Sequence, residues 1–159
     1  MLVIADVSGK GIPAALLVST LHASLHAYVE ARLPLTDLVS RLNRIVYRNT
    51  PPERFITMFV AEFNPKTHTL TYVNAGHNPP YVVNAASDNL RQLAAGGLPL
   101  GMFEDMPYQS ETVTLHPGDH VLMYTDGVTE AMNPAMEEYG DLRFLKNVRQ
   151  SLGLPLREL

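Results

Sequence analysis

The sequence contains no cysteine among its 159 residues. Such a chain forms neither a disulfide framework nor a thiolate metal site. An excess of basic residues is also absent, because 12 Lys and Arg stand against 16 Asp and Glu, for a net charge of −4. No basic stripe stands out that would neutralise phosphates, and this argues against a general nucleic-acid binder.

Long apolar runs are missing as well. No run approaches the ~18 residues needed to span a bilayer, so we expect no membrane contact from this segment and a cytoplasmic protein. With 46% hydrophobic and 18% charged residues, the composition predicts a substantial core. Since we find no internal repeat, low-complexity stretch or interdomain linker, we predict a single domain over residues 1–159.

Apolar periodicity predicts two helices in the first third of the chain. The first runs from about residue 13 to 31, and the second begins near residue 35 and stops before the proline pair at 51–52. The apolar stripe of the first helix comprises Leu17, Leu21, Leu25 and Tyr28, flanked by Ala14, Val18 and Val29.

Strand patterns dominate the rest of the chain. Residues 55–63 are apolar on nearly both faces, which indicates a central strand. The sequence NPKT at 64–67 predicts a hairpin to a strand at 68–74. Shorter strands are expected at about 80–85, 90–94, 108–115 and 119–125, before a final helix. Two helices packed on a largely antiparallel sheet form an α+β pattern.

Two short acidic turns carry the chemistry of this sequence. DVSGKG at 6–11 follows an apolar run, and TDGVTE at 125–130 follows the strand candidate at 120–124. Asp6 and Asp126 therefore lie at strand ends, where carboxylates are good oxygen ligands for Mg²⁺ or Mn²⁺. Taken singly, either turn is also consistent with plain turn chemistry, because Asp-Gly is a common hairpin signal.

Four segments resemble, in order, the metal-dependent protein phosphatases of the type-2C superfamily, in particular the bacterial SpoIIE/RsbU-like branch. They are IADVSGKGIPAA at 4–15, NAGHNPP at 74–80, GLPLG at 97–101 and YTDGVTEA at 124–131. Four motifs in this order and spacing argue against coincidence. The resemblance implies an α+β sandwich of antiparallel sheets with flanking helices.

The resemblance also implies a site and a reaction. Asp6 would bridge two Mn²⁺ or Mg²⁺ ions, the backbone carbonyl of Val7 would add a ligand, and Asp126 would bind one ion. The implied reaction is hydrolysis of phosphoserine or phosphothreonine by metal-activated water, with no phosphoenzyme. The implied substrate is a phosphorylated anti-anti-sigma-type protein in bacterial signalling, under an upstream sensory or regulatory domain.

The chain departs from the family pattern in three ways. Lys10 stands where the family usually has histidine, and the acidic motifs expected before the first strand and near the C-terminus are absent. We therefore expect a partial catalytic domain, incomplete at both ends and ending at Arg157, Glu158 and Leu159. Its unpaired strand edges favour association, with a homodimer as one form.

The alternative reading of the same fold is a regulatory or partner-binding module without catalysis. The two readings differ in what they expect outside residues 1–159. Acidic motifs there in the full reading frame favour the enzyme, and apolar residues in their place favour the module.

Other polar residues allow two interpretations each. His77 suits either a general acid or, as we favour, a hydrogen-bonding brace of its loop. His22 and His26 have the spacing of metal ligands but lack the zinc-protease pattern, so we interpret them as a helix surface without function. Glu130 lies in a matching motif and equally suits a cap of a neighbouring segment.

Overall fold

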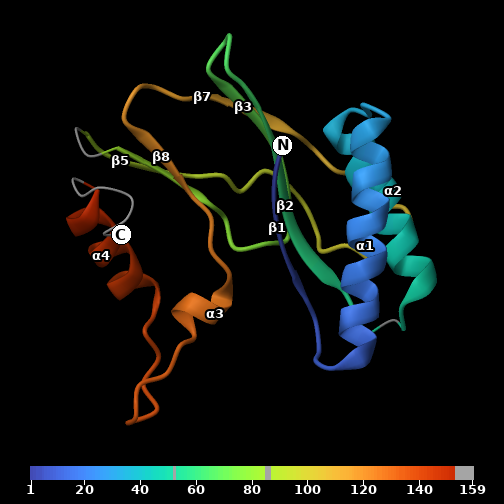
Figure 1. Cartoon of the computed structure of the whole chain (residues 1–159). Helices are drawn as coiled ribbons and strands as arrows, with labels where there is room; N and C mark the ends of the chain where they lie inside the picture. The colour runs from blue at the N-terminus through green and yellow to red at the C-terminus, as the bar shows by residue number, and fades with distance from the viewer. Residues whose placement is uncertain (52, 85–86, 153–159) are drawn as a thin grey trace. The chain divides into compact units, whose positions relative to one another are not determined.

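The computed structural model describes residues 1–51, 53–84 and 87–152 (Figure 1). The contacts within it divide the chain into two compact units, each of which is described by itself. Unit 1 comprises Met1–His77 and Ala94–Leu115, and unit 2 comprises Asn78–Leu93 and His116–Leu159. Pro52 and the C-terminal residues Arg157, Glu158 and Leu159, which figured in the sequence-based expectations, lie outside the described residues.

Unit 1 is built on a five-stranded sheet in which β2 (Ile56–Asn64) is central. Antiparallel neighbours flank it on both sides, β1 (Leu2–Val7) and β3 (Thr69–Ala75). β3 in turn pairs antiparallel with β7 (Glu111–Thr114) and parallel with the two-residue β6 (Gly96–Gly97). The position of β2 confirms the central strand predicted from its two apolar faces.

The β2–β3 connection confirms the predicted hairpin. The strands are joined by residues 65–68, and the Asn64 side-chain oxygen accepts the backbone N–H of Lys66 at 3.0 Å. This side-chain-to-backbone bond is the usual reason that asparagine begins a turn. The hairpin aligns Asn64 with Thr69 and so sets the register of both strands.

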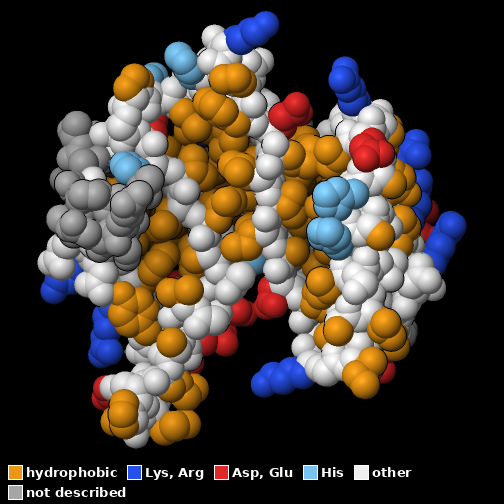
Figure 2. Space-filling model, viewed as in Figure 1, with side chains coloured by type: hydrophobic (Ala, Val, Ile, Leu, Met, Phe, Trp, Pro, Cys, Tyr) orange, Lys and Arg blue, Asp and Glu red, His pale blue; other side chains and the backbone are white. Residues whose placement is uncertain are grey.

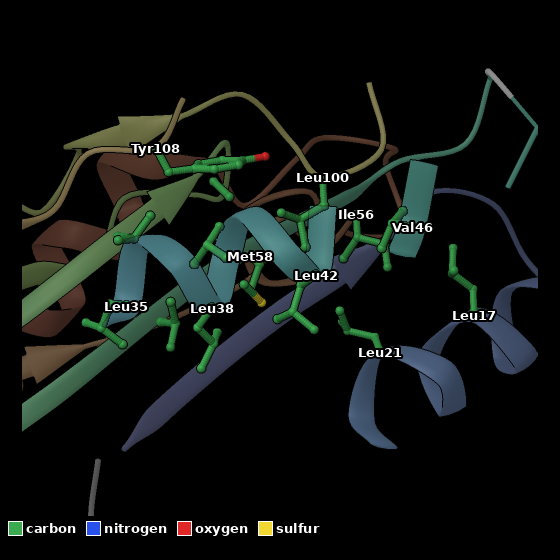
Figure 3. Close-up of a cluster of buried hydrophobic side chains, with 14 residues drawn as sticks. Leu17, Leu21, Leu35, Leu38, Leu42, Val46, Ile56, Met58, Leu100 and Tyr108 are labelled. Carbon is green, nitrogen blue, oxygen red and sulfur yellow. The ribbon is translucent and has the colours of Figure 1, made fainter. Parts of the chain in front are cut away.

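Two helices, α1 (Ile12–Glu30) and α2 (Leu35–Asn49), pack against this sheet and confirm the predicted pair (Figure 1). Their apolar side chains meet those of β2 and β3 in one buried cluster (Figure 3). Its buried members are Leu17, Leu21, Leu35, Leu38, Val39, Leu42, Val46, Ile56, Met58, Val60, Val73, Ala75, Leu100 and Tyr108. Removing this surface from water is the main contribution to the stability of unit 1.

The predicted stripe of α1 is correct except at one position. Ala14, Leu17 and Leu21 are buried, and Leu25, Tyr28 and Val29 pack against the cluster while partly exposed. Val18 is 48% exposed, so its place in the stripe was wrong.

Helix α1 also corrects the expectation about apolar runs. It is the one helix among residues 1–51, 53–84 and 87–152 that is long and apolar enough to cross a membrane by length and composition. Its mean hydropathy is 1.3, and 17% of the window is buried. Ser, Thr and His interrupt the apolar run in the sequence but lower its mean hydropathy only modestly. Ile12 and Leu16 of this helix are exposed. Figure 2 shows hydrophobic side chains on the surface of the helix.

Asn43 of α2 fastens the loop that follows the GLPLG motif. Its side-chain oxygen accepts the Gly101 N–H at 2.8 Å, and its amide donates to the carbonyls of Phe103 at 2.8 Å and Glu104 at 2.9 Å. Asn43 is 1% exposed; its bond to Gly101 is buried, and its bonds to Phe103 and Glu104 are part-buried. A buried amide that makes these bonds fixes the loop in one place on the helix.

Unit 2 contains a three-stranded antiparallel sheet in the order β5 (Ser87–Gln92), β4 (Tyr81–Asn84) and β8 (Asp119–Leu122). Helix α4 (Asp141–Ser151) packs its buried Phe144 against Tyr81, Val83 and Tyr124. The last predicted strand was too long, because β8 ends at Leu122 and the chain enters a one-turn helix, α3 (Asp126–Thr129).

We predict that Asn43→Ala lowers the free energy of unfolding by on the order of 3 kcal/mol, because the buried Gly101 N–H and the carbonyls of Phe103 and Glu104 lose their partner. Urea unfolding measures the change. Asn49→Ala is the matched control on the same helix, since the Asn49 amide bonds the Ile45 carbonyl at an exposed position. Equal losses for the two variants would contradict the role given to Asn43.

Candidate active site

Asp6 lies on the sheet of unit 1, one residue before the end of β1. It pairs with Thr57 of β2, and Val7 pairs with Ile56. Asp6 therefore lies at the strand end, as predicted, although the ladder runs two residues beyond the apolar run at 2–5. Asp6 is exposed, and its Oδ1 accepts the Val7 N–H at 2.9 Å. This bond orients the carboxylate at the sheet edge.

Ser8 anchors the chain where it leaves β1. Its backbone N–H donates to the Phe55 carbonyl at 3.0 Å, and its Oγ accepts the Phe55 N–H at 2.8 Å. The chain then turns at Gly9, whose φ of 91° favours glycine. Helix α1 follows within three residues, so Asp6 lies between a strand ladder and a helix start.

His77 lies in the middle of the NAGHNPP motif and is 3% exposed. Its Nδ1 shares a hydrogen bond of 2.8 Å with the Thr57 hydroxyl. Its backbone N–H donates to the Asn74 side-chain oxygen at 2.7 Å, and its carbonyl accepts the Asn74 amide at 3.0 Å. This geometry is that of the loop brace favoured from the sequence.

The GLPLG motif meets the same strand end. Leu100 and Ile56 exchange two backbone hydrogen bonds, at 3.0 and 2.8 Å. Pro99 packs against Gly76, where a φ of 68° and the closeness of the proline ring leave no room for a Cβ. Three of the four motifs therefore converge on residues 55–57, through Ser8, His77 and Leu100.

Asp126 belongs to unit 2, where it is half-buried and begins α3 after the N-cap Thr125. Its carbonyl accepts the Glu130 N–H at 2.7 Å. Glu130 is the exposed C-cap residue of α3, so it ends this helical turn and does not cap a following segment. The alternative of a hairpin turn at Asp126 is wrong, because the segment forms a helical turn.

Tyr124 leads into this helical turn. Its ring stacks on that of Tyr81, with centroids 6.0 Å apart, and lies tilted against that of Phe144, with centroids 4.5 Å apart. Burial, followed by the hydrogen bond with Tyr81, raises the pKa of Tyr124 to about 12. The hydroxyl therefore stays protonated at physiological pH.

Oxygen donors of the kind that Mg²⁺ and Mn²⁺ prefer are present at Asp6, the Val7 carbonyl and Asp126. Asp6 and Val7 lie in unit 1 and Asp126 in unit 2. Within the described ranges, no group of three or more His, Cys, Asp or Glu side chains gathers into a metal site. These oxygen donors suit a hard divalent ion, but only two of the three are carboxylates.

The other polar residues discussed from the sequence, Lys10, His22 and His26, lie on the surface. Lys10 is exposed. On α1, the Nε2 atoms of His22 and His26 are 3.3 Å apart at an exposed position. Thr57 was missed from the sequence, because its importance comes from a partner twenty residues away and no local pattern marks it.

Comparison with known proteins gives the family. The sequence profile described as Stage II sporulation protein E (SpoIIE) matches residues 1–159. The chain belongs to the SpoIIE family. It is 39% identical over 127 residues to phosphoserine phosphatase RsbU of Bacillus subtilis (strain 168), covering 80% of this chain and 38% of that protein. Phosphoserine phosphatase RsbP of the same organism is 32% identical over 133 residues, covering 81% of this chain and 33% of that protein.

Solved structures show the same fold. The RsbU and RsbW domains of Rv1364c from Mycobacterium tuberculosis match with a TM-score of 0.78 at 28% identity, over 95% of this SpoIIE-family chain and 42% of that one. The SiaA-PP2C domain of Pseudomonas aeruginosa matches with a TM-score of 0.80 at 20% identity, over 98% of this chain and 63% of that one. The PP2C-like α+β fold, with antiparallel sheets and flanking helices, confirms the predicted fold class.

We predict weak binding of Mn²⁺ to residues 1–159, because few anionic ligands are available to a pair of divalent ions. Isothermal titration calorimetry should find at most one occupied site, with the signal lost in Asp6→Asn. Two tight Mn²⁺ sites on this chain would refute the prediction.

We predict that Thr57→Val destabilises unit 1 by about 1–3 kcal/mol, because the buried His77 ring loses its hydroxyl partner. Thr57→Ser keeps the hydroxyl and should recover most of the loss. Thr67→Val serves as the control, since the Thr67 hydroxyl bonds Thr69 at an exposed position. If chemical denaturation shows that Thr67→Val and Thr57→Val lower the free energy of unfolding equally, the Thr57–His77 hydrogen bond does not stabilise the loop.

Proposed function

We propose that this SpoIIE-family chain is part of the catalytic domain of a Mn²⁺- or Mg²⁺-dependent phosphoserine/phosphothreonine protein phosphatase. One observation carries the proposal: three motif segments meet at the start of β2, next to the exposed carboxylate of Asp6. The phosphoserine phosphatase names of RsbU and RsbP support the same reaction class.

In this proposal Asp6 would be a ligand of both divalent ions, the Val7 carbonyl would add a ligand, and Asp126 would hold one ion. A divalent cation bound there supplies polarisation of water and neutralisation of the phosphoryl oxygens. The chain itself orients Asp6, through the Val7 N–H and through the pairing of Asp6 with Thr57. With no cysteine in the chain, a path without a thiol nucleophile agrees with the composition.

The proposed substrate is a phosphorylated anti-anti-sigma-type protein, and a sensory or regulatory domain is the proposed controlling partner. The chain spans 38% and 33% of the lengths of RsbU and RsbP, which leaves room in those relatives for other parts. A cytoplasmic location and a homodimer belong to the same proposal.

A regulatory or partner-binding module with this fold is the second candidate. One observation favours it: no cluster of three or more metal-type side chains forms in the part of the chain that the structure describes. The two candidates differ in metal-dependent turnover of a phosphate monoester, which the module lacks.

We predict that Asp6→Asn, in the protein that contains this chain, reduces kcat for a phosphoserine peptide by at least ~100-fold at saturating Mn²⁺. Asp126→Asn should cost less, because Asp126 is proposed to bind one ion and Asp6 two. A malachite-green phosphate assay with increasing Mn²⁺ measures both.

Asp37→Asn is the matched control, since Asp37 is an exposed carboxylate in the first turn of α2. It should keep wild-type turnover. If Asp6→Asn and Asp126→Asn behave like Asp37→Asn at saturating metal, the proposed function is wrong.

A further inference from the structure

Arg54 carries a charge that the fold leaves partly unsatisfied. It lies in the connection between α2 and β2, and its Nη1 atom is buried with no hydrogen-bond partner among the described residues. Burying a guanidinium N–H without an acceptor is costly, because the group has lost its water and gained nothing in exchange. Such an atom indicates that an acceptor is missing.

The backbone around Arg54 is well anchored, so the position of this side chain is not accidental. The Arg54 N–H closes a turn onto the Pro51 carbonyl at 3.0 Å. The next residue, Phe55, makes two hydrogen bonds to Ser8. Arg54 is thus fixed at the start of β2, beside the loop that follows Asp6.

The guanidinium lies against Gly9. A Cβ built on Gly9 would stand 3.8 Å from both Cζ and Nη1 of Arg54. That is an ordinary contact distance, so the guanidinium lies beside the loop that follows Asp6, and the φ of 91° is what favours glycine at this position. The register Asp6–Thr57 and Val7–Ile56 places Arg54 three residues beyond the partner of Asp6, at the same end of the sheet.

A cavity of about 420 Å³ opens beside this group and is lined by Ser8, Gly9, Pro51, Glu53 and Arg54. Glu53 is exposed, and its carboxylate repels an anion in this cavity. The ion pairs found in the described part of the chain join Arg44 to Asp105 and Arg48 to Glu104, and none joins Glu53 to Arg54.

We propose that Arg54 binds the phosphoryl group of a phosphate-monoester substrate in the cavity beside Gly9. The planar fork of a guanidinium matches two phosphate oxygens at once, and an arginine near a transferring phosphoryl group stabilises its charge. This inference deepens the proposed function and rests on it for the identity of the ligand. The anion site itself rests on Arg54, Gly9 and the cavity.

Inorganic phosphate is the probe for the first arm of the test, on residues 1–159 with a chelator present, so that no metal takes part. Phosphate should raise the Tm of the wild-type chain and leave the Tm of Arg54→Met unchanged. Arg54→Lys should keep part of the rise, because a point charge replaces the fork. Glu53→Gln should enlarge the phosphate-induced rise in Tm, since a repelling charge is removed.

Arg48→Met is the matched control, because Arg48 is an exposed arginine of α2 paired with Glu104. It should show the wild-type phosphate response. A merely structural role for Arg54 would lower the Tm of Arg54→Met without phosphate and leave its phosphate-induced rise intact, and that result overturns the inference.

The second arm uses p-nitrophenyl phosphate and Mn²⁺ with the protein that contains this chain. Arg54→Met should raise KM and the inhibition constant of phosphate by about 10-fold, more than it lowers kcat. Activity with unchanged KM and unchanged phosphate inhibition overturns the inference and leaves the proposed function standing. Loss of the Tm response in Arg54→Met, together with an inactive wild-type protein, supports the anion site and contradicts the phosphatase.

Discussion

The hydrogen bonds at the start of β2 are the constraint on which the candidate site depends. Phe55 is bonded to Ser8, Ile56 to Leu100, and Thr57 to His77. Each of these three neighbouring residues is therefore hydrogen bonded to a different loop. Because β2 is also the central strand, with Met58 and Phe59 fully buried, its start cannot move without disturbing the core. A rigid strand end therefore positions loops that are distant in sequence.

Two polar residues near this strand end differ in role: Asn43 stabilises the fold, and Arg54 is proposed to bind a ligand. Asn43 is buried with its amide and its oxygen hydrogen bonded, as expected of a residue that fastens a loop. Arg54 is half-buried and retains one N–H that finds no acceptor in the described part of the chain. Unsatisfied groups of this kind are tolerated where a ligand supplies the missing partner, and this is why Arg54 is assigned to binding.

The helices and the central strand were predicted correctly, because short-range sequence patterns determine them. The period of α1, the proline pair after α2 and the apolar faces of β2 each act within a few residues, so the helices and the central strand were found. Gly96 and Gly97 were missed as β6, because glycine has little strand preference and their pairing with β3 is a long-range contact. Val18 was misplaced because a side chain one position from a buried one still reads as part of an apolar run.

The candidate site was predictable only in part. Asp6 and Asp126 were marked by turn residues beside them and by resemblance to a known family. Thr57 and Arg54 lie in an ordinary strand start, and their roles follow from contacts with His77 and Gly9 that only the fold creates. The helical turn at Asp126 was missed because an Asp-Gly pair after a strand is equally typical of a hairpin.

The central claim is that Asp6 is the metal-binding carboxylate that this strand end positions. Paramagnetic broadening by Mn²⁺ in ¹H–¹⁵N spectra of residues 1–159 tests it most directly, because the loss of each amide signal locates the ion. The account predicts that substoichiometric Mn²⁺ first broadens the amides of residues 6–9, and that Asp6→Asn removes this broadening. Broadening that begins elsewhere, such as at His22 and His26, and that persists in Asp6→Asn would contradict it.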